Sequence, residues 1–434
     1  MKKDKTDTEE KENIEKTEAE ENQEDKKFFS DKKTVVRFIL FIIAFVTAVA
    51  FITYGVSHIG HKEEGVYEIT CDKDDEVPHY YSGITFMYNF TGSSSEINSM
   101  MKFIKGEYAE KLKMNYKLLD PVNTYEGLVN IAYINQNPGI RITVGDELFE
   151  VLSDAYEKTC EKNGYDMFSG LSARLRDQTV YSADAAEHDY YLDESLRDVM
   201  SKIKEISSKE NSVIFELDSE SHTVLFDLSD EYKAFLKEYE PDGAVLDLDL
   251  LHDAYMLKYV VRALEKDGYT DGYITTADGL SILLSGMSEV ELCLYSVKDS
   301  SEETVISATV SGKGGVSASS FRAFALTDNE LGFYTYKKDG KILYRNKYIS
   351  DFEKELSVLS CVSVSSEFNA VEAVYSNITL FISDDAAAAS SAAGKTDCSS
   401  VMYELNENDK TVYVKTGDGV KINTAKGYSF EIID

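Results

Sequence analysis

The sequence has no tryptophan, four prolines and six histidines among its 434 residues. The histidines form neither a His-Glu-x-x-His pattern nor a paired Cys/His spacing, which argues against a zinc site. There is no Gly-x-Ser-x-Gly elbow, and no histidine is placed beside a serine or cysteine as in a catalytic triad. These absences exclude the usual sequence signatures of zinc enzymes and serine or cysteine hydrolases.

Cysteine is also scarce, and its spacing carries no recognisable pattern. The five cysteines are odd in number, widely spaced and without a Cys-x-x-Cys pair. We expect idle or buried thiols, with a disulfide framework as the alternative, because all five follow residue 57 and an oxidising compartment would permit disulfides. The cysteines are Cys71, Cys160, Cys293, Cys361 and Cys398.

Basic residues are few relative to acidic ones. Lysine and arginine number 45 against 78 aspartates and glutamates, so the formal net charge is −33. A chain this acidic is repelled by DNA, RNA and anionic lipid, so we expect no nucleic-acid partner. A well-solvated surface is the simpler interpretation of the excess acid than a function specific to acid.

The one long hydrophobic run is Phe38–Ser57, which has twenty positions without a charge. At 1.5 Å per residue a helix of this length spans about 30 Å, the thickness of the bilayer hydrocarbon. A cleaved signal peptide is the rival interpretation, but its apolar region is usually about 7–15 residues long. We therefore predict an uncleaved transmembrane helix.

Basic residues gather before this run and not after it, which sets the expected topology. Lys32, Lys33 and Arg37 precede it closely, whereas Lys62 is nearly alone behind it. The positive-inside rule then places the N-terminus in the cytoplasm and the bulk of the chain outside, as a single-pass protein of the cell membrane. We predict a disordered charged tail over 1–37, the membrane helix over 38–57, an acidic stalk over 58–80 and one extracytoplasmic domain over 81–434.

Helical and strand patterns alternate without a regular βαβ order in the extracytoplasmic part. Apolar residues recur at helical spacing over 94–112, 146–162, 196–206 and 250–266, with Ser94 or Ser95 and Asp146 as expected N-caps. Strands are predicted at 84–90, 213–217, 223–228, 273–276, 280–284, 333–336, 342–344, 359–364, 378–382, 401–405 and 411–414, and residues 245–284 read as a strand–helix–strand unit. This mixed order favours α+β over a doubly wound parallel sheet.

Residues 389–396 match a relaxed form of the nucleotide-binding P-loop motif, but their surroundings do not fit a P-loop. Ala389, four residues and Gly394-Lys395-Thr396 satisfy a relaxed P-loop pattern. A P-loop needs a glycine-rich turn and a helix opening after the lysine, whereas alanines and serines precede this lysine and a strand is expected soon after it. We interpret the match as chance.

Three segments together resemble the FAD:protein FMN transferases, the ApbE-like family. Ile134-Asn135 with the 146–162 helix is similar to the family's Ser-Glu-Ile-x-x-Ile-Asn segment and its following helix. Gly164-Tyr165-Asp166 to Gly170 resembles its Gly-x-Phe-Asp-x-Thr-x-Gly loop. Asp247-Leu248, the 250–266 helix and the turn after 276 follow its Asp-Leu-Gly-Gly-Ile-Ala-Lys-Gly helix and Gly-Gly turn.

The resemblance implies a fold, an activity and a set of site residues. The fold is an ApbE-like (T-fold-like) mixed sheet with helices, and the activity is cleavage of FAD with transfer of FMN to a threonine or serine of a target protein, using Mg²⁺. An extracytoplasmic protein partner or flavinylation target would follow. By family position the cofactor-binding residues would be Met87, Tyr165, Asp166, Asp247, His252, Ala277 and Gly279.

The sequence departs from the family at the positions that handle charge. His252-Asp253-Ala254 stands where the family has Ala-Lys-Gly, and Ala277-Asp278 stands where it has Gly-Gly. The family's Asp-Ala-Leu-Ala-Thr metal motif aligns near Val374 to Ile378, and its His-Ile-x-Asp-Pro segment has no counterpart around 347–351. Two unneutralised carboxylates a few Å from a pyrophosphate would each cost about 1–4 kcal/mol.

Three interpretations remain open. The first is a retained scaffold with weakened or lost transferase chemistry, serving as a binding or assembly module. The second is an active enzyme with a relocated metal, in which Asp253 and Asp278 act as catalytic residues and jointly bind Mg²⁺. The third is an unrelated surface protein that mimics the family's order of elements. On the simplest structural interpretation, Asp253 is an exposed helix residue and Asp278 an ordinary turn residue.

Overall fold

The computed structural model describes residues 62–182, 184–298, 303–327, 330–338, 341–349, 352, 356–405, 410–417 and 421–433. The predicted cytoplasmic tail and membrane helix, residues 1–57, lie outside this part. Across the residues that are described, no helix is both long enough and apolar enough to cross a membrane. The chain divides into a unit of Met1–Glu64 with Thr91–Ser99 and a larger unit of Gly65–Phe90 with Met100–Asp434. The elements below belong to the larger unit, except that α3 begins in the smaller one.

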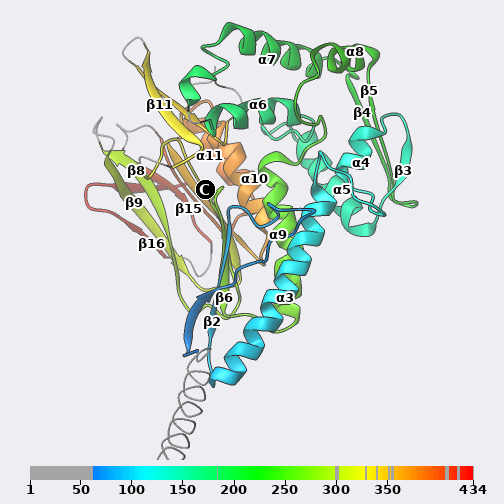
Figure 1. Ribbon diagram of the computed structural model, residues 1–434. Coiled ribbons are helices and arrows are strands. Elements are labelled where there is room, and N and C mark those ends of the chain that lie inside the picture. The colour runs from blue at the N-terminus through cyan, green and yellow to red at the C-terminus, as the bar shows by residue number, and fades with distance from the viewer. Residues whose placement is uncertain are drawn as a thin grey trace, which may run out of the picture. The chain divides into compact units, whose positions relative to one another are not determined.

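A nine-stranded sheet is the backbone of the larger unit (Figure 1). Its neighbours are antiparallel, except that the last strand runs parallel to the one before it. In spatial order the strands are β1 (Gly65–Glu68), β2 (Ile84–Phe90), β6 (Gly272–Thr276), β7 (Leu280–Leu283), β10 (Val316–Arg322), β13 (Ser360–Ser366), β14 (Ser400–Glu404), β15 (Thr411–Lys415) and β17 (Ser429–Ile432).

Helices cover this sheet and bury its core. Helix α10 (Ala370–Phe381) packs against β10 and β13, and ten of its residues are buried, so it has almost no polar face. Helix α9 (His252–Lys266) packs against α10, and its buried apolar residues include Leu257, Val260 and Val261. Helices α3 (Ser94–Leu119) and α11 (Ala386–Lys395) complete this set.

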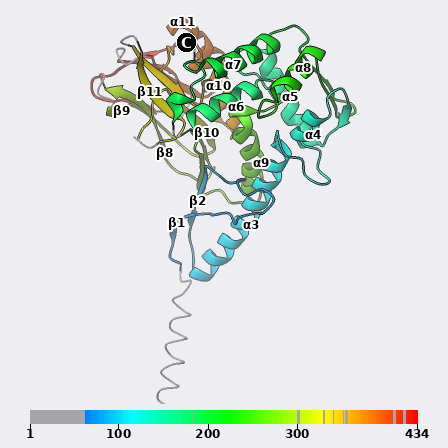
Figure 2. The same cartoon turned by 45° about the horizontal axis from the view of Figure 1, so that its top comes forward.

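Five helices and a small sheet form the second part of the larger unit (Figure 2). The helices are α4 (Ile131–Gln136), α5 (Asp146–Cys160), α6 (Gly170–Val180), α7 (Glu194–Ser207) and α8 (Asp230–Tyr239), and the sheet order is β3 (Arg141–Thr143), β5 (Thr223–Leu228), β4 (Val213–Asp218). A further sheet contains β16 (Lys421–Thr424), β9 (Glu303–Gly312) and β8 (Val290–Lys298), and β11 (Phe333–Lys338) pairs with β12 (Lys341–Asn346). Two short 3₁₀ turns, η1 (Ala185–Glu187) and η2 (Asp249–Leu251), join these elements.

The predicted α+β class is confirmed, and most predicted elements are present. Strands β2 and β5 have the predicted bounds, and β11 and β12 pair antiparallel as expected, while the predicted turn residues 339 and 340 lie outside the described part. The segment that mimics a P-loop lies in α11, which confirms that the match is chance. All five cysteines are free thiols.

Several predicted elements were wrong, each for a local reason. Residues 378–382 are not a strand: Ile378 to Phe381 form the end of α10, whose burial on all sides hides its helical period. Asp146 does not cap α5, because Gly145 occupies the N-cap position and Asp146 begins the helix. Residues 245–248 form a loop instead of a strand. Helices α4, α6 and α8 were not predicted.

Candidate functional site

A polar cleft of about 440 Å³ lies where α6, the loop before α9 and the turn between β6 and β7 meet. The end of α3 and the loop that follows it form another wall, and Lys347 enters from the segment after β12. Seven aspartates line the cleft, against three arginine or lysine side chains and one histidine. They are Asp120, Asp177, Asp242, Asp247, Asp249, Asp253 and Asp278, against Arg174, Arg176, Lys347 and His252.

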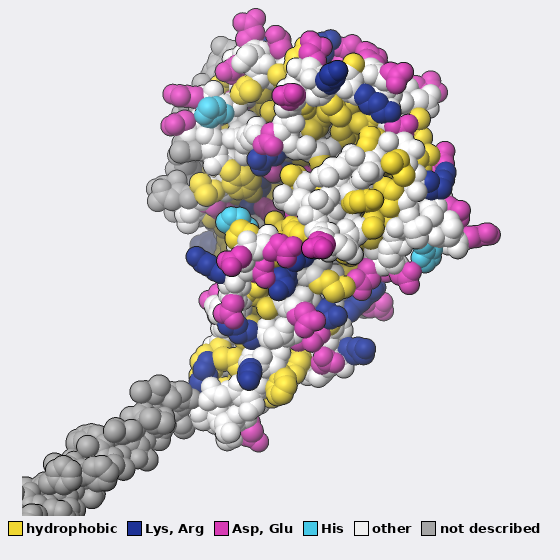
Figure 3. Space-filling view, turned by 45° about the vertical axis from the view of Figure 1, so that its right-hand side comes forward, with side chains coloured by type: hydrophobic (Ala, Val, Ile, Leu, Met, Phe, Trp, Pro, Cys, Tyr) yellow, Lys and Arg dark blue, Asp and Glu magenta, His cyan; other side chains and the backbone are white. Residues whose placement is uncertain are grey.

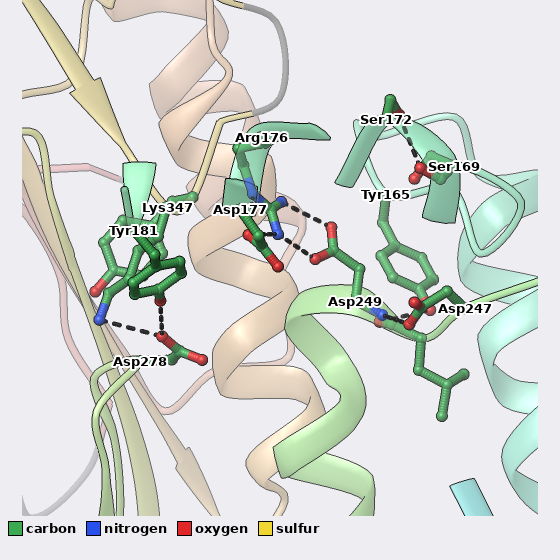
Figure 4. A network of polar contacts seen from close by, with 12 residues as sticks. Tyr165, Ser169, Ser172, Arg176, Asp177, Tyr181, Asp247, Asp249, Asp278 and Lys347 are labelled. Carbon is green, nitrogen blue, oxygen red and sulfur yellow. Dashed lines mark hydrogen bonds and ion pairs between the residues drawn. The ribbon is translucent and has the colours of Figure 1, made fainter. Parts of the chain in front are cut away.

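Arg176 is the central cation of this cleft (Figure 4). Its side chain is only 3% exposed and binds Asp249 through two hydrogen bonds, of 2.6 and 3.0 Å. Its Nε and Nη2 also donate to Asp177 Oδ1, at 2.9 and 2.7 Å. All three guanidinium nitrogens therefore already donate to carboxylates of the chain itself.

The clamp on Asp249 holds a strained backbone. Asp249 has a φ of 45°, in the left-handed region that residues other than glycine rarely adopt. Its backbone N–H donates to Asp247 Oδ1 at 2.9 Å. A conformation of this kind costs on the order of 1–3 kcal/mol and persists only when its surroundings fix it. Arg176 and Asp247 supply that constraint, so they set the shape of the loop that leads into α9.

The buried side chain of Lys347 forms a second ion pair, with the half-exposed Asp278 in the turn between β6 and β7. Its side chain is 4% exposed, and its Nζ lies 3.1 Å from Asp278 Oδ1 while also donating to the carbonyl of Ala277. The Tyr181 hydroxyl donates to the same carboxylate at 3.4 Å. The expectation that Asp278 would stand unneutralised is therefore wrong, because a lysine distant in sequence reaches it.

The loop over 244–249, which contains Asp247 and Asp249, is held in place by contacts with α4 and α6. Asn135 receives a hydrogen bond from the Leu246 N–H at 3.0 Å and donates to the Leu246 carbonyl at 2.8 Å. A Cβ on Gly170 would lie 2.3 Å from the Ala244 carbonyl oxygen, so only glycine lets α6 begin this close to the loop. The segment over 244–249 is thus held by α4 on one side and by α6 on the other.

Burial and pairing shift the protonation of several cleft residues. Burial opposes the charge of Arg176, but the charges and hydrogen bonds of Asp249 and Asp177 raise its pKa well above the ordinary value. Burial raises the pKa of Asp177 to about 6, against the opposing effect of Arg176. Burial also lowers the pKa of Lys347 and raises that of Asp247. The protonation of these residues is therefore determined by their burial and by the charges of their partners.

His252 and Asp253 open α9 at the edge of the cleft. The His252 Nδ1 lies 3.1 Å from Asp253 Oδ1. Burial works to lower the pKa of His252, but the hydrogen bond and charge of Asp253, with Asp247 behind it, raise the pKa above its usual value. The histidine thus partly offsets a carboxylate that the sequence placed where the resembled family has a lysine.

The predicted site residues are distributed over more than one place. Asp247, His252, Asp253 and Asp278 line the cleft together. Ala277 borders it through the carbonyl that accepts from Lys347. Gly279 has a φ of 83° and packs so closely on β10 that a Cβ would lie 2.2 Å from the Ser320 carbonyl oxygen.

Three other predicted residues lie elsewhere. Tyr165 and Asp166 line a separate pocket of about 470 Å³ beside α5 and β4. The Tyr165 ring is buried, and its hydroxyl donates to the Leu248 carbonyl at 3.3 Å, so it supports the cleft loop from the far side. Met87 pairs with Tyr273 in the sheet and is absent from the lining of the cleft.

Arg176, Asp249 and Lys347 are the main cleft residues that sequence reasoning missed. Arg176 occupies the buried face of α6, three residues after Ala173 and three before Thr179. A charged residue at an apolar helical position is a detectable signal, but the helix itself was not predicted. Lys347 follows β12 and meets Asp278 only through the fold.

The first and last positions of the segment that aligns with the family's metal motif have no ligand atoms in their side chains. Val374 and Ile378 are apolar, lie in α10 and are each 4% exposed. Throughout the part of the chain that the structure describes, no group of three or more His, Cys, Asp or Glu side chains could hold a metal ion. The residues present therefore do not fit a magnesium ion at that place.

Comparison with known proteins supports the fold and does not show the family. Neither a family model nor a curated protein matches the sequence. The ApbE protein from Thermotoga maritima superposes with a TM-score of 0.50 at 13% identity, covering 83% of this chain and 97% of that one. The flavin transferase ApbE from Vibrio cholerae superposes with a TM-score of 0.50 at 11% identity, covering 84% and 98%. The predicted ApbE-like fold is confirmed, and at such identities the likeness is one of fold alone.

Proposed function

We propose that this chain is a membrane-anchored, extracytoplasmic protein that keeps the flavin-transferase fold but has weakened or lost flavin transfer. It acts as a binding or assembly module for an extracytoplasmic protein partner. The fold is shared with flavin transferases, and the anchor and its orientation rest on the uncharged run over 38–57 and the basic residues before it.

The observation that carries this proposal is the state of the cations in the cleft. Arg176 is bound to Asp249 and Asp177, Lys347 to Asp278, and Arg174 to Asp242 at 2.8 Å. A dinucleotide pyrophosphate needs free cationic or N–H donors that can neutralise its charge and that of the leaving group. Arg176 and Lys347 are buried, so a ligand would have to break their existing pairs, and each broken pair would leave an uncompensated carboxylate.

The absence of ligand atoms at the aligned metal position supports the same conclusion. Flavin transfer requires Mg²⁺ in the resembled family, and Mg²⁺ binds through carboxylate oxygens and water. Val374 and Ile378 offer only hydrocarbon at that position and are sealed from water. The chain thus lacks both means of balancing phosphate charge at the positions where the family would provide them.

A transfer assay tests the proposal. The full-length protein in neutral detergent is incubated with FAD, Mg²⁺ and a flavin-accepting substrate protein, and the acceptor is analysed by mass spectrometry for an added FMN. We expect no adduct, while an active flavin transferase run in parallel gives complete conversion. Covalent FMN on the acceptor would contradict the proposal.

A second candidate function, an active enzyme with a relocated metal, has one observation in its favour. Asp253 and Asp278 line the same cleft. If they held Mg²⁺ together, any transfer activity would disappear in both Asp253→Ala and Asp278→Ala. Activity that survives both substitutions would remove this candidate.

A further inference from the structure

A larger groove lies away from the cleft, between α5, α10 and α11. It encloses about 920 Å³ and shares no lining residue with the cleft. Helix α5 forms one wall and α11 another, and the floor is formed by Glu372, Tyr375 and Thr379 of α10 with the segment that follows this helix. We call it the three-helix groove.

Each wall of the three-helix groove is a continuous helical face. Helix α5 contributes Asp154, Glu157 and Lys158, and its C-cap residue Glu161 follows, so the four are spaced by three, one and three residues. Helix α11 contributes Ala388, Ser391, Ala392 and Lys395, which have the same spacing. Residues at this spacing lie on one side of a helix, so each of the two helices presents one stripe of residues to the groove.

The floor of the groove is held in place by a compact polar network. The Tyr375 hydroxyl donates to Glu161 at 2.5 Å, and Lys158 lies 4.6 Å above the Tyr375 ring. Lys158 also pairs with Glu372 at 3.3 Å, and both side chains are nearly buried, at 12% and 13% exposure. Because these contacts tie α5 to α10, the groove is formed before any ligand arrives.

The lining indicates a protein helix more than a small molecule. Small-molecule pockets are mostly apolar, whereas half of this lining is charged. The alanines and serine of α11 leave room for close approach of another backbone, as small residues do at helix–helix contacts. A helix from another protein could bind between α5 and α11 and pack against all three helices that line the groove.

The charge of the groove lining determines the kind of helix that it could bind. The lining has six acidic side chains and three lysines, and the exposed Glu157 forms no ion pair within the described residues. The whole chain has a net charge of −33, and carboxylates (magenta) are spread over the face seen in Figure 3. A second copy of this chain would be repelled, whereas a basic helix would be attracted.

We propose that the three-helix groove binds an amphipathic α-helix of a partner protein. The helix places small residues against Ala388 and Ala392 and lysines or arginines against Asp154 and Glu157. This inference does not depend on whether the cleft binds FAD, because the two sites are separate.

Two matched peptides test the inference on the full-length protein in neutral detergent. Both are 18-residue helical peptides with an alanine face, one with lysines and the other with glutamates on the opposite face. Fluorescence anisotropy measures their binding, and hydrogen exchange locates it. We expect saturable binding of the lysine peptide alone, with protection of amides in α11.

Variants of the groove separate specific docking from general attraction to an acidic protein. Ser391→Trp fills the groove without changing charge and should weaken binding by at least about tenfold. Glu157→Lys reverses a charge at the rim of the groove and should weaken binding by about two- to fivefold. The controls Ser201→Trp and Glu238→Lys make the same changes at exposed positions of α7 and α8 and should leave binding unchanged.

Four results would overturn the inference. The lysine peptide does not bind in a saturable way, the glutamate peptide binds equally well, or Ser391→Trp binds like the wild type while retaining native circular dichroism. The fourth is a dimer in sedimentation that Ser391→Trp dissociates, which would assign the groove to a second copy of this chain.

Discussion

The cleft and the three-helix groove use charge in opposite ways. In the cleft the side chains of Arg176 and Lys347 are 3% and 4% exposed, and both are bound to carboxylates of the chain. On the wall of the groove Asp154 is 39% exposed although it pairs with Lys158 at 3.9 Å, and Glu157 is exposed and forms no ion pair within the described residues. Buried ion pairs fix the conformation of the loops that carry them and leave few free charges to bind a ligand. Exposed charges can bind an oppositely charged partner at a low desolvation cost. The buried cations of the cleft thus hold the chain's own loops, whereas Glu157 of the groove is exposed to solvent.

Removing Arg176 should produce the largest effect and shows whether the cleft is structural. Arg176→Met leaves Asp249 and Asp177 without their cation and releases the strained loop at Asp249. We expect the free energy of unfolding to fall by about 3–5 kcal/mol. Urea denaturation followed by near-ultraviolet circular dichroism, which the many tyrosines support, measures it.

The control for this variant is another arginine of the same helix. Arg174 is 50% exposed and pairs with Asp242, so Arg174→Met should cost less than about 1 kcal/mol. Equal effects of the two substitutions would mean that burial of the Arg176 pairs does not contribute as described.

The Lys347–Asp278 pair should show an intermediate effect. A double-mutant cycle with Lys347→Met and Asp278→Asn should give a coupling of about 0.5–3 kcal/mol, because the lysine is buried and the aspartate half-exposed. The exposed pair of Lys202 and Glu205 on α7 is the matched comparison, with a coupling below about 0.5 kcal/mol. A cleft coupling no larger than that of the surface pair would argue that Lys347 leaves Asp278 when the chain is in solution.

Asp177 should make the smallest contribution, visible only in its pH dependence. Its pKa in the folded protein is raised by burial to about 6, above the usual value of 3.8. A group shifted upward adds stability below its unfolded pKa and loses it as the pH rises through the folded one. The stability of the wild type relative to Asp177→Asn should therefore decline between pH 4 and pH 8. A difference that rises with pH would show that Arg176 dominates and holds the aspartate ionised.

The sequence predicted those elements whose residues form one clear stripe. Helix α9 and strands β2 and β5 each repeat their buried positions at a single period, with half-buried residues between them in the strands, so their bounds could be predicted closely. Helix α10 was mistaken in part for a strand, because Ile378, Thr379 and Phe381 have strand propensity and the helix is buried on nearly every side. Tertiary packing therefore overrides the strand propensity of these residues and keeps them in the helix.

The candidate site was predictable only where its residues are close in sequence. Asp247, His252 and Asp253 belong to one loop and helix, and Asp278 follows in the next turn. Lys347 reaches Asp278 across 69 positions of sequence, and Arg176 reaches Asp249 across 73. The spacing of residues along the chain gives no information about pairs this far apart. The carboxylates were therefore identified without the cations that bind them, and the cleft was expected to be more anionic than it is.

Binding of FAD by the full-length protein tests the central claim most directly. Flavin fluorescence and isothermal titration with FAD, with and without Mg²⁺, measure whether the cleft holds the dinucleotide. We predict no saturable binding in either condition, because the arginines and Lys347 of the cleft are already engaged. Saturable, Mg²⁺-dependent binding that Asp253→Ala and Asp278→Ala abolish would contradict the account.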